Sequence, residues 1–315
     1  MHTNKKIRGH LLAASSILVW GTTFISTKIL LRTFEPVQLV LIRFFIGYLV
    51  LCLLTGRQGH IPFENLKKEL MYAAAGLSGV SLYFLGENVA LTYTQASNVS
   101  VIITVAPCLT AILSWYFLRE KPRGLLFFLG FGLALAGIVL MSFTENSAVT
   151  LNPFGDFLAF LAACTWAAYS ILIKKMERYG YSVFRITRRI FFYGLLFLIP
   201  AALICKWELR AADVFSPVNL LYLLFLGILA SALCYVAWNK ATEYLGAIET
   251  SVYIYANPVV TILFSLLILQ EKITSGAWIG ISLTMCGLLL SEWKESQKKR
   301  IHEKVRVYED SIKNA

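Results

Sequence analysis

The sequence is divided into ten apolar runs, each about as long as a helix that crosses a membrane. A bilayer core about 30 Å thick requires roughly 20 helical residues, because an α-helix rises about 1.5 Å per residue. Charged or turn-forming residues separate the runs, and the connections are too short for a soluble domain. The runs cover approximately residues 10–31, 36–55, 70–91, 96–118, 123–143, 155–173, 183–205, 217–239, 246–269 and 274–292. The sequence therefore predicts an all-α integral membrane protein with ten transmembrane helices.

Composition supports a membrane protein. Of the 315 residues, 57% are hydrophobic and only 15% are charged, more apolar surface than a soluble domain of this size can bury. The first run follows Lys5, Lys6 and Arg8, as the apolar part of a signal peptide would. Its apolar stretch continues past any plausible cleavage point to Leu31, so we interpret it as the first transmembrane helix.

The distribution of basic residues predicts the orientation. If the N-terminus is cytoplasmic, the inner segments hold 22 Lys and Arg residues and the outer segments hold five. Arg43 and Arg189 fall inside apolar runs and belong to neither side. Because basic residues favour cytoplasmic loops, we expect both termini in the cytoplasm. The excess of basic residues on the cytoplasmic side of the lipid bilayer accounts for the net charge of +11, so a nucleic-acid partner is not expected.

The sequence gives no support for a metal site, a cofactor or ATP hydrolysis. The four histidines have no paired spacing, the cysteines have no CxxC spacing, and no P-loop motif is present. We interpret the cysteines as small packing residues of the helices. They are Cys52, Cys108, Cys164, Cys205, Cys234 and Cys286.

Two stretches of the chain repeat each other at a fixed offset of 151 residues. PCLTAILSWYFLREK begins at Pro107 and PVVTILFSLLILQEK begins at Pro258. Residues 88–121 share 13 of 34 positions with residues 239–272, without a gap. At an offset of 146, the earlier helices also match, since Trp20, Lys28 and Arg43 align with Trp166, Lys174 and Arg189. The two halves are therefore homologous five-helix units.

An odd number of helices per unit makes the second unit enter the membrane from the opposite side. The sequence thus predicts an inverted repeat, whose substrate site would lie near the midplane between the units. Pro107 and Pro258 are expected to break matched helices, although proline can also serve packing alone. The expected organisation is a cytoplasmic N-terminus (1–9), a first repeat (10–143), an outer linker (144–154), a second repeat (155–292) and a basic cytoplasmic tail (293–315).

Several motifs resemble one known family. LVWGTTFISTK, EPVQLVLIRFFIG, ENVALTYTQASNVSVIITVAPCLTAILSWYFLREK and WNKATEYLGAIETSVYIYANPVVTILFSLLILQEK are similar to the EamA family of the drug/metabolite transporter superfamily. The resemblance covers roughly residues 10–292. It implies a bacterial inner-membrane carrier that exports amino acids, related metabolites or toxic compounds, and it does not fix the substrate.

Polar and aromatic side chains recur on single faces of the predicted helices. In the first helix, Ser16, Trp20, Thr23 and Thr27 follow helical spacing. We expect such faces to meet in a central polar cavity that binds a small-molecule substrate, although the same residues can merely join helices by hydrogen bonds. The candidate substrate-binding residues are Trp20, Thr23, Tyr83, Tyr169, Trp238, Tyr253 and Asn257.

Charges inside the helices are expected to be functional because each costs about 2.5–3.5 kcal/mol at a helix centre. Lys28 and Lys174 lie near helix ends, where they can snorkel to the interface. Arg43 and Arg189 lie deeper and should face the protein interior. Each is expected to pair with a carboxylate, with helix-end carbonyl groups or with substrate.

The two halves differ at one informative position. Glu87 aligns with Trp238, so we expect Lys28, Arg43 and Glu87 to form an ionic gate near the outer mouth. The inner counterpart has basic residues but no matching acid. Burial favours the neutral acid at Glu87, whereas nearby cations favour the carboxylate. Glu87 is therefore either a proton carrier or a gate latch.

These observations predict a secondary exporter that works by alternating access. The surplus of intramembrane basic residues favours substrates with a carboxylate, such as amino acids. A broad exporter of drug-like compounds is the alternative, since aromatic residues would suit it as well. A membrane enzyme or a sensor is disfavoured, because the sequence shows neither clustered catalytic residues nor an output domain.

Two further features predict contacts. Gly276 and Gly280 form a GxxxG face, which permits close approach to a neighbouring helix of the same chain or to a second copy in a homodimer. In the tail, apolar residues at helical spacing among basic residues predict an amphipathic helix on the inner leaflet, with disorder as the alternative. They are Ile301, Val305, Tyr308 and Ile312.

Overall fold

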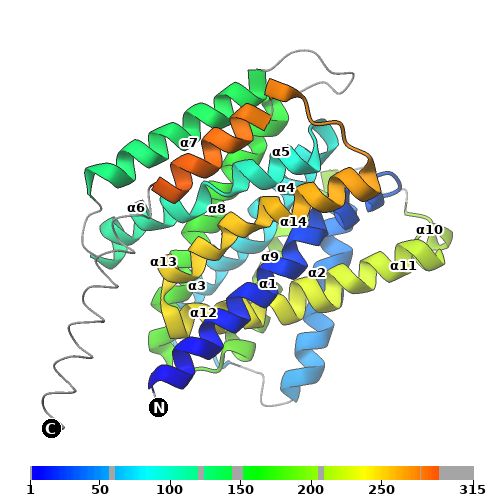
Figure 1. The fold of residues 1–315 in the computed structure, drawn as a ribbon. Helices are drawn as coiled ribbons and strands as arrows, with labels where there is room; N and C mark the ends of the chain where they lie inside the picture. The colour runs from blue at the N-terminus through cyan, green and yellow to red at the C-terminus, as the bar shows by residue number, and fades with distance from the viewer. Residues whose placement is uncertain are drawn as a thin grey trace, which may run out of the picture.

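The computed structural model describes residues 2–56, 61–119, 124–143, 152–204, 209–276 and 278–290, and these residues form a bundle of helices (Figure 1). The first half contains α1 (His2–Leu30), α2 (Pro36–Thr55), α3 (Leu66–Gly76), η2 (Leu77–Leu82), α4 (Tyr83–Tyr93), α5 (Ala96–Ile103), α6 (Ala106–Leu118) and α7 (Leu125–Phe143). The tail and most of the linker lie outside the described residues, including the tail's predicted amphipathic helix.

The second half repeats this order. It contains α8 (Pro153–Met176), η3 (Glu177–Tyr179), α9 (Val183–Ile204), α10 (Ala211–Phe215), α11 (Pro217–Leu224), η4 (Phe225–Leu233), α12 (Cys234–Leu245), α13 (Ala247–Ser251), η5 (Val252–Ala256), α14 (Asn257–Phe264), η6 (Ser265–Leu269) and a last helix, Trp278–Leu290. Among the described residues, seven helices are long and apolar enough to cross a membrane, and Leu125–Leu140 and Trp278–Leu290 are shorter apolar helices. The prediction of an all-helical membrane protein is confirmed.

One membrane helix in each half is interrupted at the same position. In the first half, Thr104 and Val105 separate α5 from α6. In the second half, the equivalent residues end the 3₁₀ segment η5, which separates α13 from α14. Pro107 and Pro258 each lie in the first turn of the segment that follows the interruption. Proline is well tolerated there because a first-turn N–H has no partner within the helix.

A π-helical stretch also recurs in both halves. At the 151-residue offset, η2 corresponds to the last six residues of η4. Such stretches leave carbonyl groups available to side chains of other helices. In η2, the absence of a side chain at Gly79 is required, since a Cβ atom there would clash with the ring of Tyr169.

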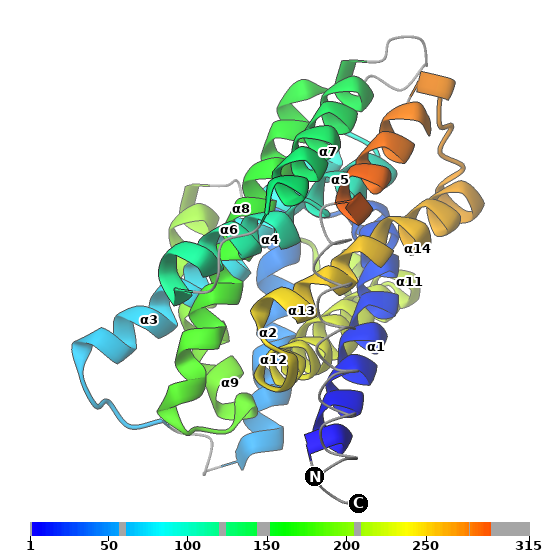
Figure 2. The same cartoon turned by 60° about the vertical axis from the view of Figure 1, so that its left-hand side comes forward.

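Helices of the two halves interleave. The helix α1 packs against α12 and α14, α2 against α9 and η4, and α4 against α8 (Figure 2). The helix α7 lies beside the last helix, where a Cβ atom on Gly137 would lie 2.6 Å from the carbonyl oxygen of Gly280. The glycine face predicted at Gly280 therefore has a neighbour within the chain.

The bundle is apolar outside and partly polar inside. Large apolar side chains such as Leu53, Leu203 and Ile204 are exposed on the bundle surface, which suits a lipid environment. Arg43 and Glu87 are buried in the interior instead. Polar chemistry is therefore concentrated between the helices.

Candidate functional site

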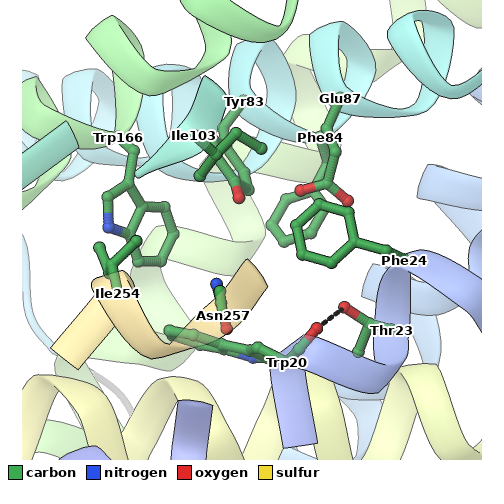
Figure 3. Close-up of a pocket in the computed structure, with 10 residues that line it drawn as sticks. All are labelled: Trp20, Thr23, Phe24, Tyr83, Phe84, Glu87, Ile103, Trp166, Ile254 and Asn257. Atoms are coloured by element: carbon green, nitrogen blue, oxygen red, sulfur yellow. Dashed lines mark hydrogen bonds between the residues drawn. The ribbon is translucent and has the colours of Figure 1, made fainter. Parts of the chain in front are cut away.

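A small, narrow cavity lies between the two halves. It is lined by residues of α1, α4 and α5 from the first half and of α8, η5 and α14 from the second half (Figure 3). Its volume is about 20 Å³, which holds about one water molecule. The lining residues are Trp20, Thr23, Phe24, Tyr83, Phe84, Glu87, Ile103, Trp166, Ile254 and Asn257.

The cavity lies where the two repeats meet symmetrically. Trp20 and Trp166 are equivalent residues of the two halves, and their rings meet edge to face with centroids 5.4 Å apart. Ile103 and Ile254, which are also equivalent, both line the cavity. The pseudo-twofold axis therefore passes through this site.

Other aromatic residues pack against the rings of Trp20 and Trp166. The Trp20 indole donates a hydrogen bond to the carbonyl oxygen of Ala230 in η4 (2.8 Å), and its ring packs on Trp238 with centroids 5.1 Å apart. On the opposite side, the ring of Tyr83 lies 4.8 Å from that of Trp166. These contacts give the cavity aromatic walls.

Three residues that line the cavity each carry a buried polar atom that has no hydrogen-bond partner among the residues that the structure describes. The atoms are Oε1 of Glu87, Nε1 of Trp166 and Oδ1 of Asn257. The three side chains are only 2%, 3% and 4% exposed. In Figure 3, Glu87 projects from the wall opposite Asn257. Because buried polar atoms are normally paired, these atoms are candidates for contact with a ligand.

Arg43 lies next to this cavity but does not line it. Its Nε donates to the Ser231 hydroxyl (3.1 Å), and its guanidinium lies 4.3 Å from the centre of the Phe84 ring. Its terminal nitrogens Nη1 and Nη2 have no partner within the described ranges. Glu87 interacts electrostatically with the guanidinium of Arg43. Within the described residues, the two side chains form no ion pair within 4 Å.

The structure does not bring Lys28 into a cluster with Arg43 and Glu87. Lys28 instead donates to the carbonyl oxygen of Thr94 and lies 3.9 Å from Oε1 of Glu271. The predicted ionic gate of three residues is therefore not formed in this conformation, because Lys28 pairs with Glu271.

Glu271 also fixes the start of a membrane helix. Its carboxylate accepts hydrogen bonds from the backbone N–H groups of Ala96 (2.8 Å) and Ser97 (3.3 Å) and from the Ser97 hydroxyl (2.8 Å). A carboxylate is favourable at a helix N-terminus, where the first N–H groups lack partners within the helix. Glu271 thereby joins the start of α5 to the segment after η6.

The basic residues of the second half pair with acids that the sequence alignment does not reveal. Nη2 of Arg189 lies 2.6 Å from Oε1 of Glu69, and the Tyr193 hydroxyl also donates to this carboxylate. Lys174 pairs with Glu177 at 2.7 Å. Position 238, which corresponds to Glu87, carries no acid. The acids that pair with these cations come instead from the start of α3 and from the first residue of η3.

Four of the seven predicted substrate-binding residues line the cavity, namely Trp20, Thr23, Tyr83 and Asn257. The other three lie elsewhere: Tyr169 donates to Oδ1 of Asn239 (2.8 Å), Trp238 packs behind Trp20, and Tyr253 hydrogen-bonds His10 (2.9 Å).

Sequence reasoning missed five lining residues: Phe24, Phe84, Ile103, Trp166 and Ile254. The repeat pairs Trp166 with Trp20, so this residue was recognisable from the sequence. Aliphatic and phenylalanine residues carry no comparable signal in a chain that is apolar throughout.

Two larger hollows lie at opposite ends of the molecule. One, of about 530 Å³, includes Lys28 and Glu271 at the C-terminal end of α1. The other, of about 500 Å³, includes Glu177, Lys240 and Glu243. The end of α12 near this second hollow contacts Gly9 at the N-terminal end of α1. The small cavity therefore separates two vestibules.

No group of three or more potential metal ligands occurs among the described residues.

Comparison with known proteins identifies similar chains. The model of the EamA-like transporter family matches residues 7–143 and 153–293. A relative from Archaeoglobus fulgidus, described as an uncharacterized transporter, is 31% identical and covers 91% of this chain and 98% of its own. The Bacillus subtilis protein YwfM, described in the same way, is 25% identical over 86% of this chain and 89% of its own. A solved crystal structure with 16% identity has the same fold, with a TM-score of 0.66 over 92% of this chain and 98% of its own.

Proposed function

This chain belongs to the EamA-like transporter family, and from that premise we propose that it exports amino acids or related small metabolites by alternating access. It is a multi-pass membrane transporter and not an enzyme. The proposal concerns the direction of transport, the substrate class and the residues that bind and couple.

The observation that carries the proposal is the position of the small cavity. It lies on the pseudo-twofold axis, next to both helix interruptions and between two vestibules. Inverted-repeat transporters expose a midplane site alternately to each side by rocking one unit against the other. Since about 20 Å³ admits no substrate, the helices around the cavity must separate before a substrate binds there.

Under this proposal, the vestibule with Lys28 and Glu271 faces outward and the vestibule with Glu177 and Lys240 faces the cytoplasm. The excess of basic residues on the latter side supports this orientation, with both termini cytoplasmic. We assign the protein to the inner membrane of a bacterial cell. The Lys28–Glu271 contact and the Glu271 cap on α5 would then close the outer side.

We further assign coupling to Glu87. Among the described residues that line the cavity, it is the only one with a charge. A carboxyl group at this position can exchange a proton with either vestibule when the cavity opens, and export would then be driven by proton entry.

A broad exporter of drug-like compounds is the second candidate. The aromatic walls favour it, because aromatic faces accept apolar molecules of varied shape. Substrate competition separates the two candidates: amino acids compete with one another under the first, whereas hydrophobic drugs displace them under the second.

The test is transport in inverted membrane vesicles with a panel of labelled amino acids and an imposed pH gradient. We expect gradient-driven accumulation of at least one amino acid in wild-type vesicles. The variant Glu87→Gln should abolish accumulation against a gradient, while downhill flux persists at a raised substrate concentration.

Two results would contradict this proposal. Absence of flux for the whole panel would exclude amino-acid export, and unchanged accumulation in Glu87→Gln vesicles would exclude coupling through Glu87. Glu243→Gln is the control, since Glu243 lies in a vestibule and is exposed. This variant should retain accumulation.

A further inference from the structure

Arg43 is a cation in the interior that no described acid contacts. It is fully buried, and its Nε donates to the Ser231 hydroxyl (3.1 Å). Its two terminal nitrogens, Nη1 and Nη2, have no hydrogen-bond partner among the described residues. An isolated charge is costly to bury, and a carboxylate that contacts it lowers this cost. The position of the neighbouring acid therefore decides what the arginine can do.

Glu87 is the acid that has the strongest electrostatic interaction with Arg43. Leu31, just before α2, and Thr92, near the end of α4, line the same vestibule, so these two helix ends lie at one end of the bundle. Arg43 on α2 and Glu87 on α4 each lie about two helical turns from that end. The two residues are therefore at a similar depth, and their helices pack against each other.

The ring of Phe84 connects the two groups. The guanidinium of Arg43 lies 4.3 Å from the centre of this ring. Phe84 and Glu87 are three residues apart on α4, so their side chains are neighbours on one helix face, and both line the small cavity (Figure 3). A cation over an aromatic face is attracted by the electrons of the ring. Phe84 thus stabilises the guanidinium while no acid contacts it.

The separation of Arg43 from Glu87 indicates that the acid is protonated in this conformation. Opposite charges attract strongly where water is excluded, so an ionised Glu87 would be drawn to the free nitrogens of Arg43. The carboxyl group is instead hydrogen-bonded to Tyr83. The other titratable side chains that face the pair are Cys234 and Tyr235 of α12, and, like Tyr83, residues of these types are ordinarily neutral near pH 7.

We propose that Arg43 is a positioning residue for proton coupling: it pairs directly with the Glu87 carboxylate once the proton has left, and it withdraws to the Phe84 ring when the carboxyl group is protonated. The proton passes to water in the vestibule to which the cavity is then open. The inference rests on the proposed function, because it concerns the coupling step at Glu87.

Such a pair would connect protonation to the arrangement of the two halves. Ser231, which holds Nε of Arg43, belongs to η4 of the second half, whereas Glu87 belongs to α4 of the first half. Formation of the ion pair would therefore draw α4 toward α2 and η4, and protonation would release it.

The test measures the protonation of Glu87 in full-length protein reconstituted into liposomes. The reagent is dicyclohexylcarbodiimide, an apolar compound that modifies protonated carboxyl groups, and peptide mass spectrometry gives the labelled fraction of Glu87 at each pH. We expect this fraction to fall as the pH rises in the wild type. A fraction that does not change between about pH 4 and pH 10 contradicts the proposal, because the acid then exchanges no proton in that range.

The variants are compared at the pH at which half of the wild-type Glu87 is labelled. Arg43→Gln removes the cation and should raise the labelled fraction to about nine tenths or more, because an opposite charge nearby favours the carboxylate. Arg43→Lys keeps the charge and should stay close to the wild-type fraction. An unchanged fraction in Arg43→Gln, or an equal rise in Arg43→Lys, overturns the proposal.

Arg189→Gln is the matched control. It removes the equivalent cation of the second half, whose acid is Glu69, and should leave the labelled fraction of Glu87 unchanged. If Arg43→Gln does not fold, Ser231→Ala decides the proposal, since it keeps the arginine and frees its Nε to move toward the acid. The labelled fraction should then decrease, and an unchanged or larger fraction contradicts the proposal.

Thermal unfolding gives a second, independent measurement. At about pH 9, Arg43→Gln should lower the Tm by about 2 °C more in the presence of Glu87 than in combination with Glu87→Gln, because only the carboxylate interacts with the cation. At about pH 5 the two effects should be equal. The same difference at both pH values would contradict a pair that forms on loss of the proton.

Neither measurement requires a substrate. If labelling responds to Arg43 as expected and no amino acid is accumulated in vesicles, the export function fails and the Arg43–Glu87 pair stands. If accumulation depends on Glu87 but labelling does not respond to Arg43, the export function stands and the pair fails.

Discussion

Arg43 and Arg189 occupy equivalent positions in the two halves and have opposite surroundings. Arg189 is partly exposed and is neutralised by Glu69, which also accepts from Tyr193. Arg43 is fully buried, and its terminal nitrogens have no partner in the portion of the chain described here. Arg189 thus joins α9 to α3 through an ion pair. Arg43 forms no ion pair with the described residues.

The positions of Glu87 and Trp238 show a second difference of this kind. Trp238 is buried and packs on Trp20, whereas Glu87 lines the cavity, and its Oε1 has no hydrogen-bond partner among the described residues. The two units of an inverted repeat have similar folds, and they can exchange conformations during transport. The two halves therefore differ in polarity at this pair of equivalent positions.

The largest effect is expected at the two equivalent positions 238 and 87. Trp238→Ala removes a buried indole and should lower the free energy of unfolding by about 4 kcal/mol. Glu87→Gln should change it by less than about 1 kcal/mol, because the amide keeps nearly the same volume and can still accept the hydrogen bond from Tyr83. Thermal unfolding in detergent measures both, and equal losses would remove the distinction between a packing position and a ligand position.

Substitutions of Arg43 and Arg189 should differ less in their effect on the free energy of unfolding than those of Trp238 and Glu87. Arg189→Met breaks hydrogen bonds to a carboxylate and should cost about 2 kcal/mol. Arg43→Met should cost about 1 kcal/mol, since the loss of the Ser231 hydrogen bond and of the Phe84 contact is partly offset by the removal of a buried charge. The comparison is made on the same unfolding scale. A greater loss for Arg43→Met would show that its charge stabilises the fold.

A smaller effect is expected at the end of the molecule that Glu271 closes. Glu271→Ala removes the acceptor for the first N–H groups of α5 and should cost about 1 kcal/mol. Its repeat equivalent, Glu120, lies outside the described residues. Hydrogen exchange of the backbone at Ala96 and Ser97 should become faster in the variant, and unchanged exchange would mean that other groups hold this helix start.

The smallest effect concerns Tyr235, whose hydroxyl distinguishes it from Phe84. Tyr235→Phe frees the carbonyl oxygen of Gly79 and should cost about 1 kcal/mol or less. The freed carbonyl can then accept from Trp166, as Ala230 accepts from Trp20, which limits the cost. Thermal unfolding in detergent measures it, and a loss above about 2 kcal/mol would show that Trp166 does not replace the lost donor.

Much of the fold was predictable because long apolar runs and an internal repeat leave few alternatives in a membrane. The partners of the charges were not predictable from aligned positions. Glu69 and Glu271 lie at helix ends, and three-dimensional packing brings them to Arg189 and Lys28. Alignment compares positions within a repeat, whereas these contacts join different helices.

The candidate site was predicted in part for a related reason. Polar residues on a helix face, such as Trp20 and Asn257, indicate an interior cavity. The same pattern selected Tyr169 and Tyr253, whose hydroxyl groups bind Asn239 and His10 instead. Residue type alone does not distinguish a side chain that contacts a ligand from one that joins two helices.

The central claim is that Glu87, which lines the cavity, takes part in transport, whereas Glu69, which pairs with Arg189 of the other half, does not. Accumulation of labelled amino acids in inverted vesicles with wild type, Glu87→Gln and Glu69→Gln tests it directly. We predict that accumulation against a gradient is lost in Glu87→Gln and kept in folded Glu69→Gln. Equal losses in both variants, or wild-type accumulation in Glu87→Gln, would contradict the claim.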